Sequence, residues 1–182
     1  TLSSSSAASD VYKRQHYGIM GWDSSIYDPG YFSLPGDSHK FRDWKKSGHG
    51  NVNLHKSVVE SVDTYYYKLS YQLGIDRLHD WMTRFNFGSK TGIDLPGEKT
   101  GVYPSTEWKM KTYKKAWLPG ETISVSIGQG YFLATPLQIA NGIAMLASDG
   151  QHLTPHLLKK STGAEHITPI EKPDGKIQYN GN

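Results

Sequence analysis

The sequence predicts a mixed α/β (α+β) fold in which helices form most of the structure. Two observations favour helices: apolar residues recur at helical spacing across residues 75–87, and residues 136–148 form a long apolar segment behind a helix-start signal. A third observation favours some sheet, because Ile123, Val125 and Ile127 alternate with serines at the period of a strand. With 182 residues, the chain is long enough for one modest core but not for several domains.

The first part of the chain is expected to be loop followed by two short helices. Residues 17–44 are rich in glycine, proline, aspartate and aromatics, and Pro-Gly pairs mark turns, so we expect loop with short extended pieces. A helix is expected over residues 54–60, with Asn53 as its N-cap. A second helix is expected over residues 63–73, with Gly74 as its stop signal.

The middle of the chain is expected to hold one more helix, a loop and a short strand. Residues 75–87 predict a helix with Asp76 as N-cap. Residues 97–120 are irregular and polar, and residues 121–131 predict a short strand that ends in a turn at residues 128–130. The core face of the helix is expected to consist of Ile75, Leu78, Trp81, Met82 and Phe85.

The last predicted helix starts at Thr135, which serves as N-cap, with Pro136 in its first position. It extends to about Ser148 and is apolar over most of its surface, which is typical of a buried helix that packs against a sheet. Residues 150–158 begin like a strand, and the chain after residue 159 is polar and rich in proline and glycine, as in a loop.

Composition excludes several classes of protein. There is no cysteine, so disulfides and thiolate metal sites are excluded. The net charge is only +3 and basic residues are scattered, so nothing indicates a nucleic-acid groove. The densest basic stretch, residues 109–115, is interpreted as a solvated face, with contact to an anionic glycan or a partner as the alternative. No segment reaches the apolar length of a membrane span.

Residues 1–15 are set aside from fold reasoning. Residues 5–15 resemble a translated sequencing adaptor, and the alternative is a Ser/Ala-rich disordered tail. We therefore assign residues 16–182 to one partial domain and expect the gene to be cut at its start.

Ser61 and Asp63 stand two residues apart at the junction between the first two predicted helices. Neither residue is tied to a helix face there, so the hydroxyl and the carboxylate can point into one cavity. A Ser-x-Asn or Ser-x-Asp is the second of three active-site motifs in penicillin-recognising serine enzymes. The alternative is that Ser61 or Asp63 only caps the second helix.

Several sequence blocks around this motif occur in a fixed order. Together they resemble the middle of the transpeptidase domain of class B penicillin-binding proteins, nearest to the elongation-specific penicillin-binding protein 2 subfamily. The resemblance covers residues 17–159 and implies a penicillin-binding-protein/serine β-lactamase-like fold, here mainly its helical subdomain and the start of the sheet. The blocks are Tyr27-Asp28-Pro29, Phe41 to Lys46, Gly48-His49-Gly50, Glu60 to Tyr65, Thr91 to Glu98, Gly128 to Tyr131 and Ala134 to Gln138.

The resemblance implies catalytic roles for Ser61 and Asp63. Ser61 would pass a proton between the lysine of the first motif and the leaving or incoming amine. Asp63, at the family's Asn position, would hydrogen-bond that lysine and orient the substrate. The first motif, Ser-x-x-Lys, does not occur in the 182 residues, so the nucleophile is expected upstream of Tyr17.

Ser89-Lys90-Thr91-Gly92 repeats the letters of the third motif, Lys-Thr-Gly, but we reject it as that motif. The family's motif lies on a strand edge, whereas this segment follows a predicted helix end, and Ile93 stands where Ser or Thr is expected. Lys90 is therefore expected on the surface, and the true third motif further along the chain.

The resemblance also implies a metal site, because some members hold a structural zinc with two Asp, one His and one Cys. Asp28, Asp43 and His49 match the first three ligands, whereas Val62, which cannot coordinate a metal, stands at the Cys position. Two interpretations are open: the three residues and a water bind zinc, or the metal is lost. In the second, favoured interpretation, Asp28 caps a turn before Pro29, and Asp43 and His49 bond to nearby backbone; no cofactor is then required.

The implied function is that of a peptidoglycan D,D-transpeptidase of cell-wall elongation, which binds D-Ala-D-Ala stem peptides and β-lactams. The intact protein would be anchored in the bacterial inner membrane with its catalytic domain in the periplasm, beside a membrane glycosyltransferase. The alternatives are a non-catalytic penicillin-recognising sensor or scaffold, and a D,D-carboxypeptidase or serine β-lactamase. Because this chain lacks Ser-x-x-Lys, we expect it not to be acylated by a penicillin.

Overall fold

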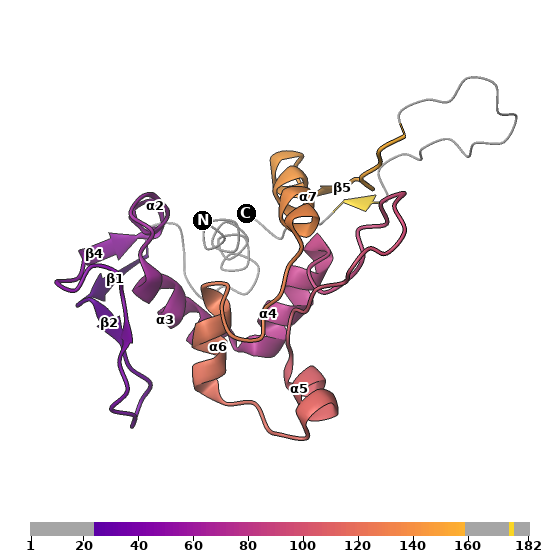
Figure 1. Ribbon diagram of the computed structural model, residues 1–182. Helices are drawn as coiled ribbons and strands as arrows, with labels where there is room; N and C mark the ends of the chain where they lie inside the picture. Colours follow the sequence, from indigo (N-terminus) through magenta and orange to yellow (C-terminus); the bar gives the residue numbers. More distant parts are fainter. Residues whose placement is uncertain (1–23, 159–174, 177–182) are drawn as a thin grey trace, which may run out of the picture.

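A computed structural model describes residues 24–158 and 175–176 of the chain. The predicted boundary between residues 15 and 16 lies outside these residues. In Figure 1, the first strands and helix α2 lie on one side, helices α4 and α7 on the other, and α3 and α6 between them. Among the described residues, no helix is both long and apolar enough to span a bilayer.

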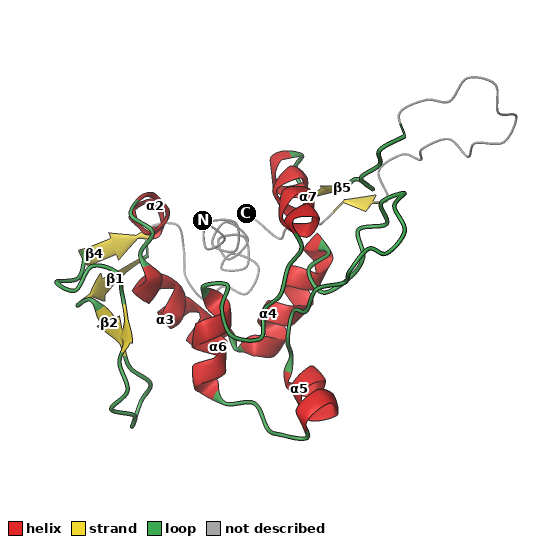
Figure 2. Cartoon of the chain, in the orientation of Figure 1, coloured by secondary structure: helices red, strands yellow, loops and turns green. Residues whose placement is uncertain are grey.

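In the described part of the chain, the strands form separate two-stranded sheets; the strands are drawn in yellow in Figure 2. β1 (Ser25–Asp28) pairs antiparallel with β4 (Gly50–Asn53), with Ile26 opposite Val52 and Asp28 opposite Gly50. β2 (Tyr31–Phe32) pairs with β3 (Phe41–Arg42), and β5 (Gln151–His152) pairs with β6 (Gly175–Lys176). The short extended pieces expected in residues 17–44 are thus confirmed where the chain is described, and the strand expected after residue 150 is short.

Helices α2 (Leu54–Val59) and α3 (Asp63–Leu73) confirm the first two predicted helices. Asn53 caps α2, because its side-chain oxygen accepts a hydrogen bond from the backbone N–H of Lys56 at 2.9 Å. Gly74 ends α3 with φ +77, a conformation that glycine adopts without a steric penalty.

The third predicted helix is present in two parts, α4 (Ile75–Met82) and the 3-10 turn η1 (Thr83–Phe85). The predicted core residues are buried, but the predicted N-cap is wrong. Gly74 precedes the helix without a side-chain cap, and the Asp76 carboxylate instead accepts hydrogen bonds from the backbone N–H and hydroxyl of Thr106. Asp76 therefore joins α4 to a segment thirty residues later in the chain.

Two further expectations are wrong in the middle of the chain. Residues 97–120 include a helix, α5 (Thr106–Tyr113), whose N-cap Ser105 accepts from the N–H of Trp108. The predicted strand at 121–131 is helix α6 (Pro119–Ser126). Pro119 is suited to the first turn, and the Glu121 carboxylate accepts from the N–H of Leu118 at 2.8 Å, so start signals outweigh the alternation of Ile and Val.

Helix α7 (Pro136–Ala147) starts as predicted, with the Thr135 hydroxyl accepting from the N–H of Gln138 and the Gln138 side chain accepting from the N–H of Thr135. Its burial differs from the prediction, because one face is buried and Ile143 is 50% exposed. Among the described residues, α7 contacts η1 and the short β5, so the expected packing of α7 on a sheet is not found there.

The described residues bury two hydrophobic clusters. The larger one fills the space between α3, α4, α6 and α7 and consists of Leu69, Leu73, Ile75, Leu78, Trp81, Met82, Phe85, Phe87, Tyr103, Val125 and Met145. The smaller one lies between the paired strands β1 and β4 and the start of α3 and consists of Ile26, Val52, Leu54, Val62, Tyr65 and Tyr66. Val62, the middle residue of the predicted Ser-x-Asp motif, is part of the smaller cluster.

Candidate active site around Ser61 and Asp63

Successive side chains at the junction between α2 and α3 alternate between solvent and the protein interior. The N–H of Val62 donates to the carbonyl of Ser57 at 3.0 Å, which closes the end of α2. Ser61 adopts a left-handed conformation with φ 51, and its side chain is exposed, whereas Val62 is fully buried in the smaller cluster. The junction therefore presents the Ser61 hydroxyl to solvent and anchors itself through Val62.

Asp63 is the first residue of α3 and is half-buried. Its burial, together with the negative charges of Asp43 and Asp28, raises the pKa of the Asp63 carboxyl to about 6. A carboxyl with this pKa exchanges protons near neutral pH, as a proton-relay group requires. The alternative in which Ser61 or Asp63 caps α3 is wrong, because Val62 is the N-cap residue and no side-chain cap bond forms there.

The three residues matched to the family's metal ligands lie together beneath this junction. Asp28 ends β1, Asp43 follows β3, and His49 precedes β4; all three are buried. One ligand atom from each lies within 4.8 Å of the others. His49 Nδ1 is 2.7 Å from Asp28 Oδ2 and 3.8 Å from Asp43 Oδ1. We call these three residues the Asp–His cluster.

The Asp28 carboxylate accepts hydrogen bonds from the turn that follows it and from His49. Its Oδ1 accepts from the N–H of Gly30 at 2.7 Å, and its Oδ2 accepts from the backbone N–H of His49 at 2.9 Å. Burial alone would raise the pKa of Asp28, but the hydrogen bonds from His49, Gly30 and Thr64 outweigh it, so the pKa lies below its ordinary value. The predicted turn cap at Asp28 is thus confirmed.

Asp43 joins a turn to the start of α3. Its Oδ1 accepts from the N–H of Lys45 at 3.2 Å, and its Oδ2 accepts from the N–H of Thr64 at 3.2 Å. Thr64 is the second residue of α3, so Asp43 provides the acceptor that Val62 cannot offer. The expectation that Asp43 and His49 bond to nearby backbone is confirmed for Asp43 by its bond from Lys45, and both residues also bond across 21 residues of the chain.

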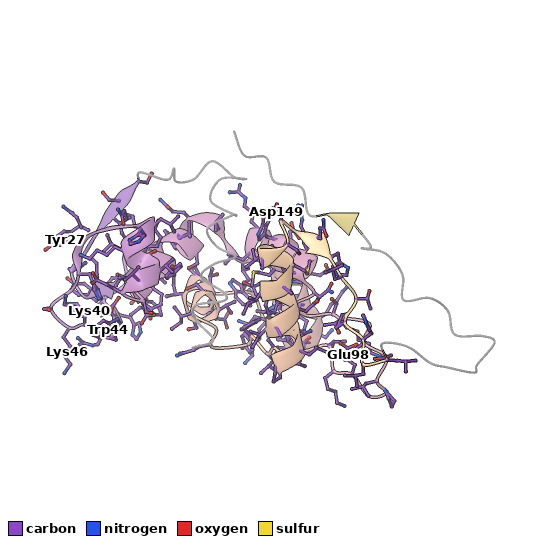
Figure 3. All side chains as sticks on the ribbon, turned by 90° about the horizontal axis from the view of Figure 1, so that it is seen from above. Tyr27, Lys40, Trp44, Lys46, Glu98 and Asp149 are labelled. Carbon is purple, nitrogen blue, oxygen red and sulfur yellow. The ribbon has the colours of Figure 1, made fainter. Side chains whose placement is uncertain are left out.

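Two residues that the sequence did not single out cover the other side of His49. The Trp44 ring meets the His49 ring edge-on at 5.3 Å, and its Nε1–H donates to the Glu60 carbonyl at 3.1 Å. His49 Nε2 is buried without a hydrogen-bond partner among the described residues and lies 3.9 Å from Glu60 Oε2. Trp44 stands at the outer edge of this region in Figure 3, with Glu98 at the opposite end of the molecule.

The residues present do not complete a structural zinc site. Such a site takes four protein ligands, and the Asp–His cluster supplies three. The fourth family position, Val62, is 0% exposed and packs with hydrocarbon side chains. The remaining unpartnered atom, His49 Nε2, faces Glu60, whereas Nδ1 faces the two aspartates, so a metal on Nε2 would be on the wrong side of the ring.

The Lys90-Thr91-Gly92 segment behaves as a turn. It lies outside any helix or strand, and Lys90 is exposed, as predicted. The Glu98 carboxylate accepts from the N–H and hydroxyl of Thr91 and from the N–H of Gly92, which closes the loop on itself. Rejection of this segment as the third catalytic motif is consistent with that geometry.

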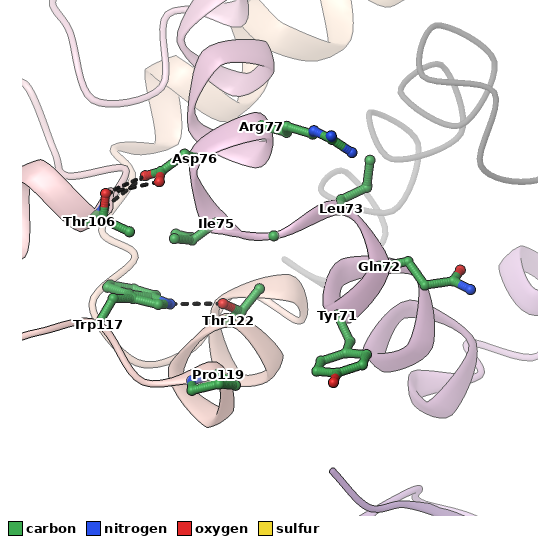
Figure 4. Close-up of a pocket in the computed structure, with 11 residues that line it drawn as sticks. Tyr71, Gln72, Leu73, Ile75, Asp76, Arg77, Thr106, Trp117, Pro119 and Thr122 are labelled. Carbon is green, nitrogen blue, oxygen red and sulfur yellow. Dashed lines mark hydrogen bonds between the residues drawn. The ribbon is translucent and has the colours of Figure 1, made fainter. Parts of the chain in front are cut away.

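An open pocket of about 540 Å³ lies between the end of α3 and the starts of α4 and α6 (Figure 4). Leu73, Ile75 and Trp117 line it, and Trp117 Nε1 donates to the Thr122 hydroxyl at 2.8 Å at its edge. Neither Ser61 nor Asp63 lines this pocket, so the prediction that these two side chains share a cavity stays a prediction.

Comparison with known proteins identifies the family. The sequence profile of the penicillin binding protein transpeptidase domain matches residues 13–179. The chain belongs to this transpeptidase family. It is 59% identical over 166 residues to the peptidoglycan D,D-transpeptidase MrdA of Acinetobacter baumannii, and 44% identical over 164 residues to MrdA of Escherichia coli K12. The match covers 91% of this chain and 25% of the first relative, so the chain spans about a quarter of that relative's length.

Solved structures of the penicillin-binding protein family share this fold. The structure of Pseudomonas aeruginosa PBP2 in complex with WCK 5153 matches with a TM-score of 0.90 and 42% identity, over 98% of this chain and 40% of that one. The complex of Helicobacter pylori PBP2 with MreC matches with a TM-score of 0.79 and 39% identity, over 85% of this chain and 28% of that one. The predicted fold class, with helices and small sheets of a transpeptidase domain, is therefore confirmed.

Proposed function

We propose that the protein to which this chain corresponds is a serine peptidoglycan D,D-transpeptidase that acts in cell-wall elongation. The observation that carries the proposal is the α2–α3 junction, where Ser61 exposes its hydroxyl beside a half-buried Asp63 with a raised pKa. This pair lies within a chain 59% identical to a protein named peptidoglycan D,D-transpeptidase.

The proposed reaction is acyl transfer in two steps. A serine hydroxyl adds to the penultimate D-Ala carbonyl of a stem peptide, the C–N bond to the terminal D-Ala breaks, and the leaving amine takes a proton. The amine of a second stem peptide then attacks the ester, loses a proton and releases the serine. The serine and the lysine of the Ser-x-x-Lys motif are proposed to come from parts of the protein other than these 182 residues.

In this proposal, Ser61 and Asp63 serve the proton transfers. The Ser61 hydroxyl can both donate and accept a hydrogen bond, so it can link the motif lysine to the leaving amine and then to the incoming one. Asp63 accepts a hydrogen bond from that lysine, and its negative charge favours the protonated lysine. Burial and the negative charges of Asp43 and Asp28 disfavour the ionised form of Asp63 and raise its pKa to about 6.

The proposed ligands and partners follow from the family. The substrate would be a D-Ala-D-Ala stem peptide, and β-lactams would trap the same serine. The proposed setting is the periplasmic face of the bacterial inner membrane, beside a membrane glycosyltransferase. Support for the glycosyltransferase comes from a 31% identical structure described as polymerization and crosslinking by a peptidoglycan synthase complex. The complex of Helicobacter pylori PBP2 with MreC supports a partner protein in general.

The test is a chimera in which residues 24–158 replace the matching segment of the Acinetobacter baumannii relative. We expect the chimera to be labelled by a fluorescent penicillin and to form cross-links from D-Ala-D-Ala stem peptides. Ser61→Ala in the chimera should reduce acylation at least tenfold, as expected for loss of a proton-relay group, whereas Lys90→Ala, on the exposed loop, should leave it unchanged.

Two outcomes would contradict the proposal. A folded chimera that is not labelled would favour a scaffold without turnover. A labelled chimera that hydrolyses the acyl group, with water in place of an amine as acceptor, would favour a carboxypeptidase or β-lactamase. The circular dichroism spectrum and melting temperature of the chimera distinguish both outcomes from misfolding.

A further inference from the structure

We infer that the Asp–His cluster of this chain is a metal-independent clamp that caps helix α3 and holds the Ser61–Asp63 junction in place. The inference concerns the geometry of this chain and stands apart from the proposed reaction. The Asp–His cluster supplies three ligand residues, whereas a structural zinc requires four.

The carboxylate oxygens of the cluster already have donors from the protein. Asp28 Oδ1 and Oδ2 accept from the N–H groups of Gly30 and His49, and Asp43 Oδ1 and Oδ2 accept from those of Lys45 and Thr64. Asp28 Oδ2 also lies 2.7 Å from His49 Nδ1. Backbone N–H groups that converge on a carboxylate stabilise its negative charge, so these buried aspartates do not need a cation for that purpose.

Helix α3 gains from the same contacts. Its N-cap residue, Val62, offers no acceptor for the free N–H groups of the first turn. The Asp43 carboxylate fills that role from 21 residues earlier in the chain, because its Oδ2 accepts from the Thr64 N–H at 3.2 Å and lies 3.4 Å from the Thr64 hydroxyl. A negative charge at this end is also favoured by the helix dipole.

The position that would complete a zinc site contributes to the clamp in another way. Val62 is 0% exposed and lies in one buried cluster with Ile26 and Val52, so it ties the junction to the paired strands β1 and β4 through apolar contacts. A cysteine there would replace hydrocarbon with a thiolate ligand. The chain therefore holds the junction through two separate contacts, the Asp43 cap on α3 and the apolar contacts of Val62, where a four-ligand zinc would otherwise tie both together.

The first experiment measures metal content and its effect on stability in the full 182-residue chain and in the chimera described above. We expect zinc well below one per chain after purification with added zinc, and the same melting temperature with and without EDTA. Val62→Cys should bind one zinc per chain, and its melting temperature should fall in EDTA. Val52→Cys, which places a thiol in the same buried cluster at another position, should bind none.

The second experiment tests the cap directly by hydrogen exchange at the Thr64 amide. Asp43→Ala should speed this exchange at least tenfold, as expected for loss of a helix cap, and by more than it speeds exchange of the amides at the end of α3. Asp43→Asn, which keeps an oxygen acceptor, should restore much of the protection. Asp37→Ala, which removes an exposed turn carboxylate that accepts from His39, should not affect the Thr64 amide.

Each result decides the inference. Stoichiometric zinc in the unmodified chain, with a melting temperature that falls in EDTA, would overturn it. A folded Val62→Cys protein without zinc would show that Val62 is not the missing ligand position and would also overturn it. An unchanged Thr64 amide in Asp43→Ala would refute the cap. Because none of these measurements reads catalysis, a failure of the proposed transpeptidase function would leave them interpretable.

Discussion

The region around Trp81 and the region around His49 differ in the chemistry of their buried side chains. Around Trp81, helices α3, α4, α6 and α7 bury a continuous apolar cluster. Around His49, the protein buries two carboxylates and an imidazole beside a small apolar cluster. The stability of the first region depends on the apolar area that it buries and on close packing. The stability of the second depends on a specific hydrogen-bond partner for each buried polar atom. The comparison predicts that the two regions fail in different ways when they are mutated.

The largest effect is expected in the apolar region. Trp81 is 0% exposed and packs against Phe85, with ring centroids 6.3 Å apart. Trp81→Ala should reduce the free energy of unfolding by about 3–5 kcal/mol, since it removes buried area and leaves a cavity. Urea unfolding followed by fluorescence or circular dichroism measures this, with Tyr27→Ala, at a 71% exposed side chain, as the matched control. A loss below that of the control would show that the cluster is not the main core.

The polar region should show a smaller loss from a single truncation. Asp43→Ala removes the acceptor for the N–H groups of Lys45 and Thr64 and leaves α3 without a cap. We expect the free energy of unfolding to fall by about 2–3 kcal/mol, the range for an uncapped helix and buried donors without partners. Asp43→Asn should lose less in the same urea titration. Equal losses for Ala and Asn would indicate that the charge, and not the hydrogen-bond geometry, holds this region together.

A gain in stability is expected at Asp63, where burial opposes ionisation. The folded-state pKa of about 6 lies above the unfolded value, so the protonated carboxyl stabilises the fold below about pH 4, and this contribution is lost as the pH rises through 6. At pH 7, Asp63→Asn should be more stable than the unmodified chain by about 1 kcal/mol, allowing for solvent screening of a half-buried group. Melting curves from pH 4 to 8 should show the difference vanish at the acidic end. A constant difference over that range would contradict the raised pKa.

The smallest effect is expected on the surface of α5. Glu107 and Lys111 form an ion pair at 2.6 Å, four residues apart, and both side chains are 74% exposed. Glu107→Gln should leave the melting temperature unchanged within error, because solvent and salt screen such pairs. A clear drop, particularly one that persists in high salt, would mean that α5 contributes more to the fold than its exposed position indicates.

The same contrast explains what could be predicted from the sequence. Helices α2, α3, α4 and α7 were predicted from local signals: the caps Asn53 of α2 and Thr135 of α7, Gly74 as the stop of α3, and apolar spacing in α4. Helix α6 was mistaken for a strand because Ile123 and Val125 alternate with serines, and the start signal at Pro119 was overlooked. A local signal, Ser105, could also have indicated α5.

Only those residues of the candidate site that match motifs of the family were predicted from the sequence. Ser61, Asp63 and the three residues of the Asp–His cluster were singled out on that basis, and the structure brings the cluster together beneath the junction. The cap that Asp43 provides for α3 could not be predicted, because its partner Thr64 is 21 residues away and no local pattern links them. Glu60 and Trp44 were missed for the same reason, since their proximity to His49 arises from folding.

The backbone at Ser61 limits which amino acids can supply a hydroxyl at this point. With φ at 51, the residue occupies a region that β-branched side chains strongly disfavour. Threonine carries the same functional group but would distort the loop, whereas glycine and asparagine would suit the conformation and abolish the alcohol. A library of all amino acids at position 61 should therefore separate residues that fit the left-handed backbone from residues that supply a hydroxyl. Serine is expected to meet both requirements.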